Sequence, residues 1–263
     1  MFFTSCFIKR CVVFVFLVQF VSVFGQETLK VEYKEIYNTD SPRARSAIMQ
    51  INPSNSVYVS LMQTTQLIKS EQELNTKKQD DPFNVNLNYA INVGSTLDDY
   101  YWYDLKNQKM QFISDIGDKR FSIQDTYSIK WQITNETKTI ANFKTYKAIT
   151  KFRGRIWEAW FAPDLAYPYG PWKLHCLPGL ILEAYDTSKR YSYIATKIFK
   201  DDKNISFDVS KLPKLDFKTF TLQDFEFKDN VLSAPITRNT KVINYNEQRK
   251  GEEIEYEWEI STK

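Results

Sequence analysis

Residues 137–164, TKTIANFKTYKAITKFRGRIWEAWFAPD, decide the fold class of this chain. Two runs with a period of two residues, 146–152 and 156–161, flank a turn sequence at 153–155. Period two is typical of a strand, because successive side chains of a strand point to opposite faces. Aromatic and β-branched side chains that face one another across such a hairpin contribute about 0.2–1 kcal/mol each. The stretch therefore predicts a β-hairpin.

The same pattern recurs along the chain on both sides of this hairpin. Strict alternation in TLKVEYKEIYN predicts a half-buried strand over 28–38. Turn-rich segments between apolar runs predict further antiparallel strands at 44–64, 83–93, 98–125 and 180–200. We therefore expect a mainly β protein with one long curved antiparallel sheet and few short helices. By fold-level analogy alone, the sheet is expected to form a half-barrel like those of periplasmic lipoprotein carriers.

The C-terminal part of the chain carries two further predictions. Residues 201–250 are more polar and less periodic, so we expect loops and a short helix there. In EEIEYEWEI, apolar residues at 254, 256, 258 and 260 alternate with glutamates at 253–259. This alternation predicts an edge strand whose glutamate row faces water, which discourages sheet-to-sheet aggregation.

The N-terminus predicts export. Lys9 and Arg10 precede an apolar run over 11–24, which is too short to span a bilayer. Val23 and Gly25 are small enough for the −3 and −1 positions of a cleavage site before Gln26. We interpret residues 1–25 as a secretory signal peptide, and we expect no transmembrane segment in the mature chain.

The charge and length of the mature chain limit its possible domain organisation and partners. Residues 26–263 are expected to form a single β-rich domain. Removal of the signal peptide leaves 33 basic residues against 32 acidic ones. This even balance argues against a nucleic-acid partner, which would require a one-sided basic surface.

The mature chain holds one cysteine and one histidine, which are neighbours. Cys6 and Cys11 leave with the signal peptide, so Cys176 cannot form an intramolecular disulfide. His175 and Cys176 together cannot supply the three or four ligands of a zinc site, and we expect no metal and no cofactor. On an extended chain the two side chains would point to opposite sides and would not hydrogen-bond one another. We therefore interpret them as a buried thiol and a partly exposed imidazole.

The segment GPWKLHCLPGLILEAYD, at 170–186, combines two prolines and two glycines with an apolar run. Pro178 and Gly179 fit the central pair of a type II turn. This turn is expected to redirect the chain into a strand over 180–186.

The same segment resembles the signature of the GLPGLI family, secreted proteins of Bacteroidetes-type bacteria without an established function. The hexapeptide of the family falls on 176–181, where Cys176 stands in place of the first glycine. The resemblance is strongest over 130–200 and weaker over 31–45. It implies a β-rich fold, an envelope location and genes close to those of outer-membrane receptors, and it supplies no catalytic residues. We expect an extended backbone at position 176, where a cysteine is tolerated.

Aromatic and apolar residues gather around this signature. They are expected either to line a groove that binds an apolar or carbohydrate ligand, or to pack as a core under the sheet. The candidate binding surface consists of Trp157, Trp160, Tyr169, Trp172, Leu177, Pro178 and Leu180.

Three groups of charged residues offer other chemistry, each with a simpler structural alternative. Glu158 and Glu183 lie in apolar strands and could serve as buried catalytic carboxylates, or they could lie on a solvated face. Arg153 and Arg155 could grip an anionic partner, or they could mark a charged hairpin tip. Acidic pairs at 98–99 and 201–202 could bind calcium, or they could be ordinary turn residues.

The function predicted from the sequence is that of a secreted cell-envelope binding or accessory module, without catalysis, which acts with an envelope or outer-membrane protein. One alternative is a carrier that holds an apolar small molecule in the concave face of the sheet. A second alternative is an envelope hydrolase that uses strand carboxylates.

Overall fold

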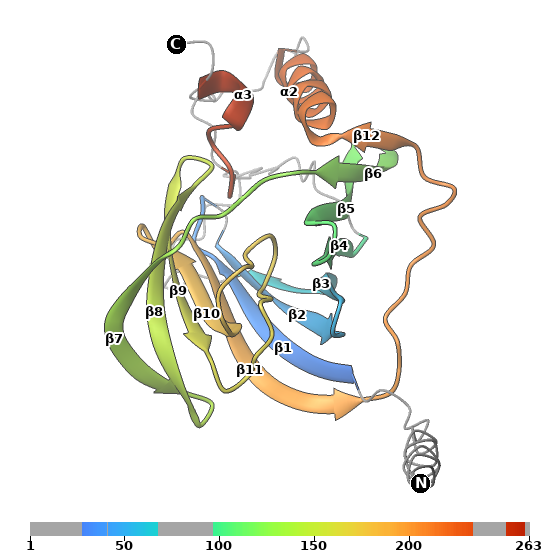
Figure 1. Cartoon of the computed structure of the whole chain (residues 1–263). Helices are drawn as coiled ribbons and strands as arrows, with labels where there is room; N and C mark the ends of the chain where they lie inside the picture. The colour runs from blue at the N-terminus through green and yellow to red at the C-terminus, as the bar shows by residue number, and fades with distance from the viewer. Residues whose placement is uncertain (1–27, 41, 68–96, 234–250, 261–263) are drawn as a thin grey trace, which may run out of the picture.

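One sheet of 12 strands organises the part of the chain that the structure describes (Figure 1). The computed structural model describes residues 28–40, 42–67, 97–233 and 251–260. The predicted signal peptide and the predicted strand at 83–93 lie outside these ranges. The strands are β1 (Thr28–Tyr37), β2 (Arg43–Ile51), β3 (Asn55–Leu67), β4 (Asp99–Asp104), β5 (Lys109–Ile116), β6 (Lys119–Asp125), β7 (Gln132–Ile140), β8 (Phe143–Phe152), β9 (Arg155–Ala162), β10 (Leu180–Asp186), β11 (Tyr191–Asp201) and β12 (Lys214–Asp216).

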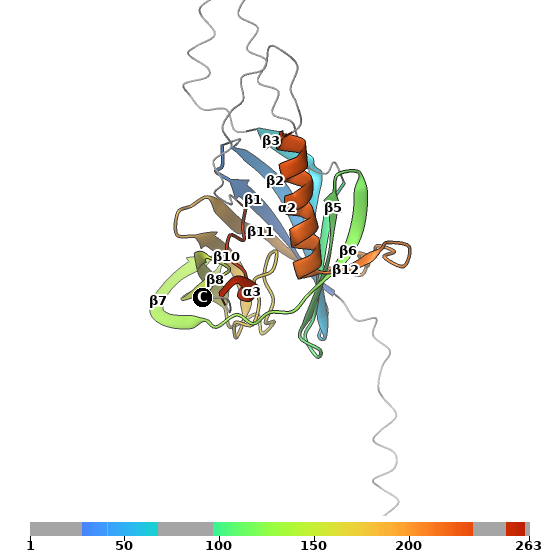
Figure 2. The same ribbon diagram turned by 90° about the horizontal axis from the view of Figure 1, so that it is seen from above.

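The order of the strands is β12-β6-β5-β4-β3-β2-β1-β11-β10-β9-β8-β7. β1 lies between β2 and β11 and joins the two halves of the sheet, and both of these pairings are antiparallel. Only β12 pairs in parallel, with β6, so the sheet is mixed at this edge. The sheet curls strongly, and residues 126–131 cross its open side from β6 to β7 (Figures 1 and 2). The predicted mainly β fold with a long curved sheet is confirmed.

The hairpin predicted from 146–161 is present as β8 and β9. Ala148 faces Ala159 and Thr150 faces Trp157 across it, and all four side chains are buried. The sequence did not indicate β7, which pairs with β8 at the edge of the sheet. Every residue of β7 is exposed or half-buried, so this strand shows no apolar face from which it could be recognised.

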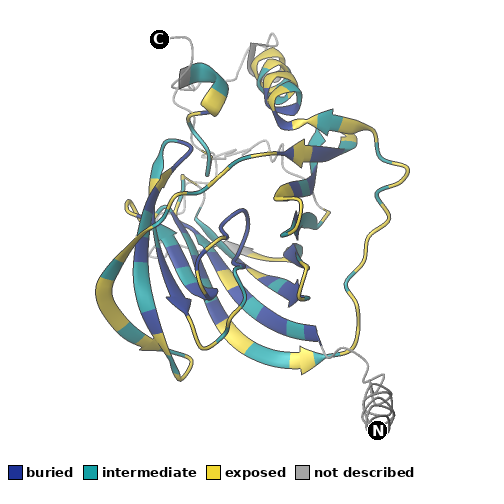
Figure 3. Ribbon diagram, viewed as in Figure 1, coloured by how far each residue is buried: buried dark blue, intermediate teal, exposed yellow. Residues whose placement is uncertain are grey.

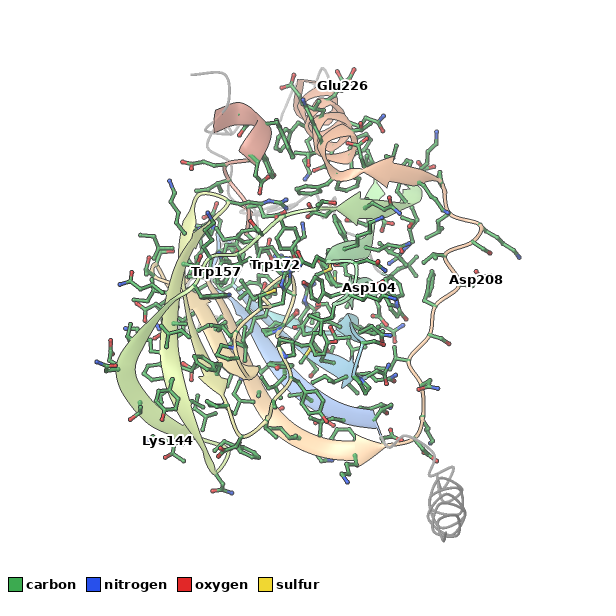
Figure 4. The ribbon with its side chains drawn as sticks, in the orientation of Figure 1. Asp104, Lys144, Trp157, Trp172, Asp208 and Glu226 are labelled. Carbon is green, nitrogen blue, oxygen red and sulfur yellow. The ribbon has the colours of Figure 1, made fainter. Side chains whose placement is uncertain are left out.

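Residues 163–179 leave the sheet between β9 and β10 and fold into its concave side, where Figure 3 shows much of this segment buried. We call this segment the inner loop. Leu174 and Leu177 are each 1% exposed. The Trp172 ring lies 5.4 Å from that of Trp157 on β9, and it stacks on Tyr193 of β11 (Figure 4). The concave side is therefore filled by the chain itself.

Helix α2 (Phe217–Ser233) follows β12 within the polar region where a short helix was expected, and it has 17 residues. Asp216 caps its N-terminus, because its carboxylate accepts a hydrogen bond from the Thr219 N–H at 2.9 Å. Phe217 and Phe220 pack edge-on against Phe112 of β5. No helix of the described residues is long and apolar enough to cross a membrane.

The predicted edge strand at 253–260 is wrong. Residues 257–260 form the short helix α3 (Glu257–Ile260), and none of residues 251–256 is in a strand. The N–H groups of Ile254 and Glu255 both donate to the carbonyl oxygen of Arg153 instead of joining a ladder. Tyr256 and Trp258 stack on one another with ring centroids 4.7 Å apart. Contacts between distant parts of the chain thus override the local alternation.

Candidate binding site

Four segments meet in a buried group of charges at the open side of the sheet. Asp125 ends β6, Arg153 lies in the β8–β9 turn, Lys173 belongs to the inner loop and Glu253 precedes α3. We call these four residues the Arg153 cluster. Arg153 grips Asp125 with two hydrogen bonds of 2.7 and 2.8 Å. The Lys173 ammonium donates to Asp125 and to Glu253, both at 2.9 Å.

The charges in the Arg153 cluster compensate one another. The side chains of Arg153, Lys173 and Asp125 are each no more than 2% exposed. Burial by itself raises the pKa of Asp125, but the charges of Lys173 and Arg153 and their hydrogen bonds hold it below its ordinary value. Arg153 also pairs with Glu253 and Glu257. A buried and fully paired arginine is not a charged hairpin tip, so that interpretation of Arg153 is wrong.

A pocket of about 180 Å³ lies beside the Arg153 cluster, between β4, β5, α2 and the segment before α3. We call it the α2 pocket. The Lys173 ammonium lies 3.9 Å from the centre of the Phe217 ring and 4.4 Å from that of Phe112. The wall of the α2 pocket therefore combines aromatic rings with a buried cation. The lining residues are Tyr101, Phe112, Ser114, Trp172, Lys173, Phe217, Phe220, Thr221, Asp224, Phe225, Gly251, Glu252, Glu253 and Tyr256.

The size of the α2 pocket limits what it can hold. Sites for drug-sized ligands are usually about 300–1,000 Å³. The pocket is therefore suited to a small molecule or to one side chain of a partner, and it is too small to enclose a lipid.

Six of the seven predicted binding residues are buried in the core. Trp157, Tyr169, Leu177 and Leu180 are no more than 1% exposed. Trp160 and Trp172 are 8% and 7% exposed, and only Pro178 is exposed to solvent. Of the alternatives considered, the structure thus supports core packing. A role in binding stays a prediction for these residues, and Trp172 is the one member that lines the α2 pocket.

The interpretation of His175 and Cys176 needs correction. The backbone of Cys176 is left-handed, with φ of +69°, and not extended. This conformation turns its side chain toward that of the preceding residue, and the Cys176 Sγ lies 2.8 Å from the His175 Nδ1. The thiol is exposed and the imidazole is only 3% exposed, the reverse of the expected burial. A non-glycine residue pays a steric cost at positive φ, which explains why a glycine suits this position of the hexapeptide.

The turn at Pro178 and Gly179 is also not of type II. The Gly179 N–H donates to the carbonyl oxygen of Leu177, which closes a three-residue turn around Pro178. The Leu180 N–H donates across the inner loop to Leu165. Gly179 has φ of +155°, and a Cβ atom there would lie only 2.4 Å from the Ala162 carbonyl oxygen. Glycine is required because two backbone segments touch at this point.

A second buried carboxylate, Glu35 of β1, escaped the sequence analysis. It is 1% exposed and pairs with Arg45. It also accepts hydrogen bonds from Tyr37 at 3.3 Å and Tyr58 at 2.6 Å, and one from Ser60. The alternation of this strand could have predicted its burial, because Glu35 falls on the same strand face as Val31 and Tyr33.

The proposed carboxylate pair is engaged in surface ion pairs. Glu158 lies 3.1 Å from the Lys147 ammonium and accepts a hydrogen bond from Tyr185 at 2.9 Å. Burial works to raise the pKa of Glu158, but these two contacts lower it overall. Glu183 pairs with Lys138 at 2.7 Å. Carboxylates held by lysines at a half-exposed surface fit the solvated-face alternative better than a general acid.

The remaining predicted sites have structural partners. Arg155 pairs with Asp186 at 3.2 Å and donates to the Gly251 carbonyl oxygen. Asp201 pairs with Lys30 at 2.7 Å, and the hydrogen bond from Lys30 lowers the pKa of Asp201 to about 2. Within the described ranges, no three His, Cys, Asp or Glu side chains are grouped so as to hold a metal ion.

Comparisons with known proteins yield weak structural likenesses only. No family model matches the chain, and no curated protein matches it. A structure of PNGF-II is 17% identical with a TM-score of 0.49, over 76% of this chain and 34% of that one. An uncharacterized conserved protein from Thermus thermophilus is 6% identical with a TM-score of 0.35, over 73% and 92% of the two chains. A putative outer membrane lipoprotein-sorting protein domain from Vibrio parahaemolyticus is 9% identical with a TM-score of 0.23, over 70% and 89%. The chain thus spans about a third of PNGF-II.

Acidification is expected to destabilise the protein through His175, its only histidine. Burial lowers the pKa of His175 to about 3, whereas an unfolded histidine has a pKa of about 6.5. Between these values the unfolded chain binds a proton that the folded chain does not, so stability falls by about 1.4 kcal/mol per pH unit as the pH decreases. Urea unfolding at pH 6.5 and pH 5 should therefore show that the wild type loses about 2 kcal/mol more than His175→Phe.

The comparison with His175→Phe separates the effect of the histidine on stability from the opposite effects of other titrating groups. Burial raises the pKa of Asp99 to about 7, so Asp99 favours the folded state as the pH falls through this window. That contribution is present in both proteins and cancels in their difference. Equal losses in the two proteins would show that the imidazole is not buried in a neutral form.

Proposed function

We propose that this chain is a secreted cell-envelope protein of the GLPGLI type, which acts as a binding or accessory module for an envelope partner. In this proposal the α2 pocket receives the anchor of the partner, either one apolar or aromatic side chain or a small group of similar size. The N-terminal signal sequence and the hexapeptide at 176–181 support the location and the family.

The α2 pocket is the observation on which this proposal depends. It opens where the inner loop, α2 and the segment before α3 converge on the sheet, and seven of its fourteen lining residues are aromatic. Interfaces gain most of their affinity from a few aromatic or apolar anchors that fill such pockets. The Arg153 cluster fixes Lys173 in the pocket wall, so the site is held in shape before a partner arrives.

The two alternatives receive less support from the same features. A carrier would hold its apolar ligand in the concave face, but the inner loop fills that face with buried side chains such as Trp172 and Leu177. A hydrolase based on Glu158 and Glu183 would need at least one carboxyl group that keeps its proton near neutral pH. Both glutamates instead form ion pairs with lysines.

Native mass spectrometry of the protein purified gently from the envelope of its producer tests the proposal. We expect an added protein mass on the wild type and its loss from Ser114→Trp, in which an indole occupies the pocket. Ser114 lines the pocket, is half-buried and is not an aromatic anchor itself. Leu222→Trp is the matched control, since Leu222 is 54% exposed on α2 and does not line the pocket.

Two other outcomes of this experiment would count against the proposal. An added small mass that resists Ser114→Trp would favour the carrier alternative. An added protein mass that both tryptophan variants retain would place the partner elsewhere on the molecule.

A further inference from the structure

The α2 pocket contains a carboxylate that the fold leaves without a cation. Glu252 belongs to the segment before α3, lines the pocket and is half-buried. Among the residues that the structure describes, no side chain forms a hydrogen bond or an ion pair with this carboxylate. Burial raises the pKa of Glu252, because its charge is removed from water without a matching partner. The carboxylate is therefore open to a positive group that enters the pocket.

The other charged side chains of the α2 pocket are already paired. The Lys173 ammonium donates to Glu253 at 2.9 Å, and Asp224 pairs with Lys228 at 2.6 Å. These charges compensate one another, so Glu252 leaves the pocket with an excess of negative charge. An anionic occupant would be repelled. An apolar occupant would cover Glu252 without giving it a partner, which costs free energy.

The aromatic lining of the α2 pocket also suits a cation. Ring faces attract an ammonium group within about 6 Å of their centres. The chain already uses this attraction, because the Lys173 ammonium lies 3.9 Å from the centre of the Phe217 ring. Tyr101 and Phe220 line the same pocket, and no cation of the described residues lies over either ring. Burial raises the pKa of Tyr101, and the charge of Glu252 is among those that raise it further, so these two side chains lie near one another.

We propose that the occupant of the α2 pocket is a lysine side chain of the partner, with its ammonium at Glu252 and its alkyl stem along the aromatic rings. This inference rests on the proposed function and names the group through which the partner is recognised. A lysine combines a compact charge with an apolar stem, so it pairs the carboxylate and buries apolar surface at the same time. A compact ammonium also suits a pocket of about 180 Å³ better than the wider, planar guanidinium of arginine.

Calorimetric titration with n-butylammonium chloride tests this chemistry in the absence of a partner, because n-butylammonium is the lysine side chain without its backbone. We expect saturable binding to the wild type. Binding of n-butanol, which has the same alkyl chain without the charge, should be weaker by about tenfold or more. Glu252→Gln should weaken the binding of n-butylammonium by a similar factor, since the amide keeps the shape of the side chain and loses its charge. Constant ionic strength keeps general screening equal in all samples.

Two further variants show whether the binding occurs in the α2 pocket. Glu255→Gln is the matched control, because Glu255 belongs to the same segment, is 50% exposed and pairs with Lys151 outside the pocket. It should bind n-butylammonium as the wild type does, whereas Ser114→Trp should abolish the binding. Glu252→Gln removes no ion pair and should fold at least as stably as the wild type. The comparison of the two ligands on the wild type needs no variant.

Native mass spectrometry separates this inference from the proposed function. We expect Glu252→Gln to lose the added protein mass, as Ser114→Trp does, and Glu255→Gln to retain it. A partner that is lost from Ser114→Trp but retained by Glu252→Gln would leave the α2 pocket as the docking site and overturn lysine as its anchor. Binding of n-butylammonium at Glu252, together with a partner that Ser114→Trp retains, would also overturn the lysine anchor, since the pocket would then take a free amine. Equal affinities for n-butylammonium and n-butanol would overturn a cationic occupant of any source.

Discussion

Replacing Arg153 with methionine is expected to lower the free energy of unfolding by about 3–5 kcal/mol. The guanidinium is 1% exposed and makes a two-pronged ion pair with Asp125, together with ion pairs to Glu253 and Glu257. Methionine fills similar space but leaves Asp125 and Glu253 with Lys173 as their only cation in the Arg153 cluster. A buried carboxylate without full compensation costs much more than the ion pair contributes over an apolar replacement. Urea unfolding at pH 7 measures the loss.

Lys151→Met is the matched control for this experiment. Lys151 lies two residues earlier on β8, and its pair with Glu255 is exposed on both sides, at 67% and 50%. Its replacement should change stability by no more than about 0.5 kcal/mol. If Arg153→Met were no more destabilising than this control, the Arg153 cluster would not hold the four segments together.

The pH dependence of the Arg153→Met effect provides an independent check. The pKa of Asp125 is lowered in the folded state, so the stability it provides is complete above the unfolded value of about 3.9. That stability is lost as the pH falls through the lower folded pKa. The difference in the free energy of unfolding between wild type and Arg153→Met should therefore shrink below about pH 4. In this range the wild type loses the stability that ionised Asp125 provides, which the variant already lacks. A difference that stays constant down to about pH 2 would point to packing and not to charge.

The sheet could be predicted from sequence because its hairpins are local. In the β8–β9 hairpin the residues that face one another are close in the chain, and their alternation is visible without any knowledge of the rest of the fold. The glutamate row at 253–259 shows the limit of this reasoning. Its alternation is that of a strand, yet Glu253 is directed at Arg153, 100 residues away. A period of two residues shows that a segment can form a strand. It does not show whether contacts with distant residues favour another structure.

The sequence named Arg153 and Trp172 as candidates, but the sites that they help to form could not be predicted for the same reason. The members of the Arg153 cluster come from four separate parts of the chain, and nothing in their spacing shows that they meet. The pairing of His175 with Cys176 depends on one backbone angle, the positive φ of Cys176, which a non-glycine residue rarely adopts. The extended geometry assumed from sequence is the usual one, and it placed the two side chains on opposite sides.

Replacing Trp157 with alanine is expected to lower the free energy of unfolding by about 3–5 kcal/mol. Its side chain is 0% exposed and packs against both Trp172 of the inner loop and Tyr193 of β11. The loss combines the apolar surface removed with the cavity that remains, since packed surroundings relax only in part. Ile156→Ala is the control on the same strand, because Ile156 is 49% exposed and should cost no more than about 0.5 kcal/mol.

The Trp157→Ala cavity also tests whether the inner loop closes the concave face. An apolar cavity of this kind binds small aromatic molecules, and a ligand that binds only the folded state raises its stability. Indole should therefore raise the urea midpoint of Trp157→Ala by more than that of the wild type, in which the Trp157 side chain fills this space. If indole stabilised both proteins equally, it would bind at a site that Trp157→Ala does not create, and Ser114→Trp would then show whether that site is the α2 pocket or the concave face. A larger effect in the variant would mean that the Trp157 side chain fills the space in which indole binds, so that this part of the concave face is core and not a ligand site.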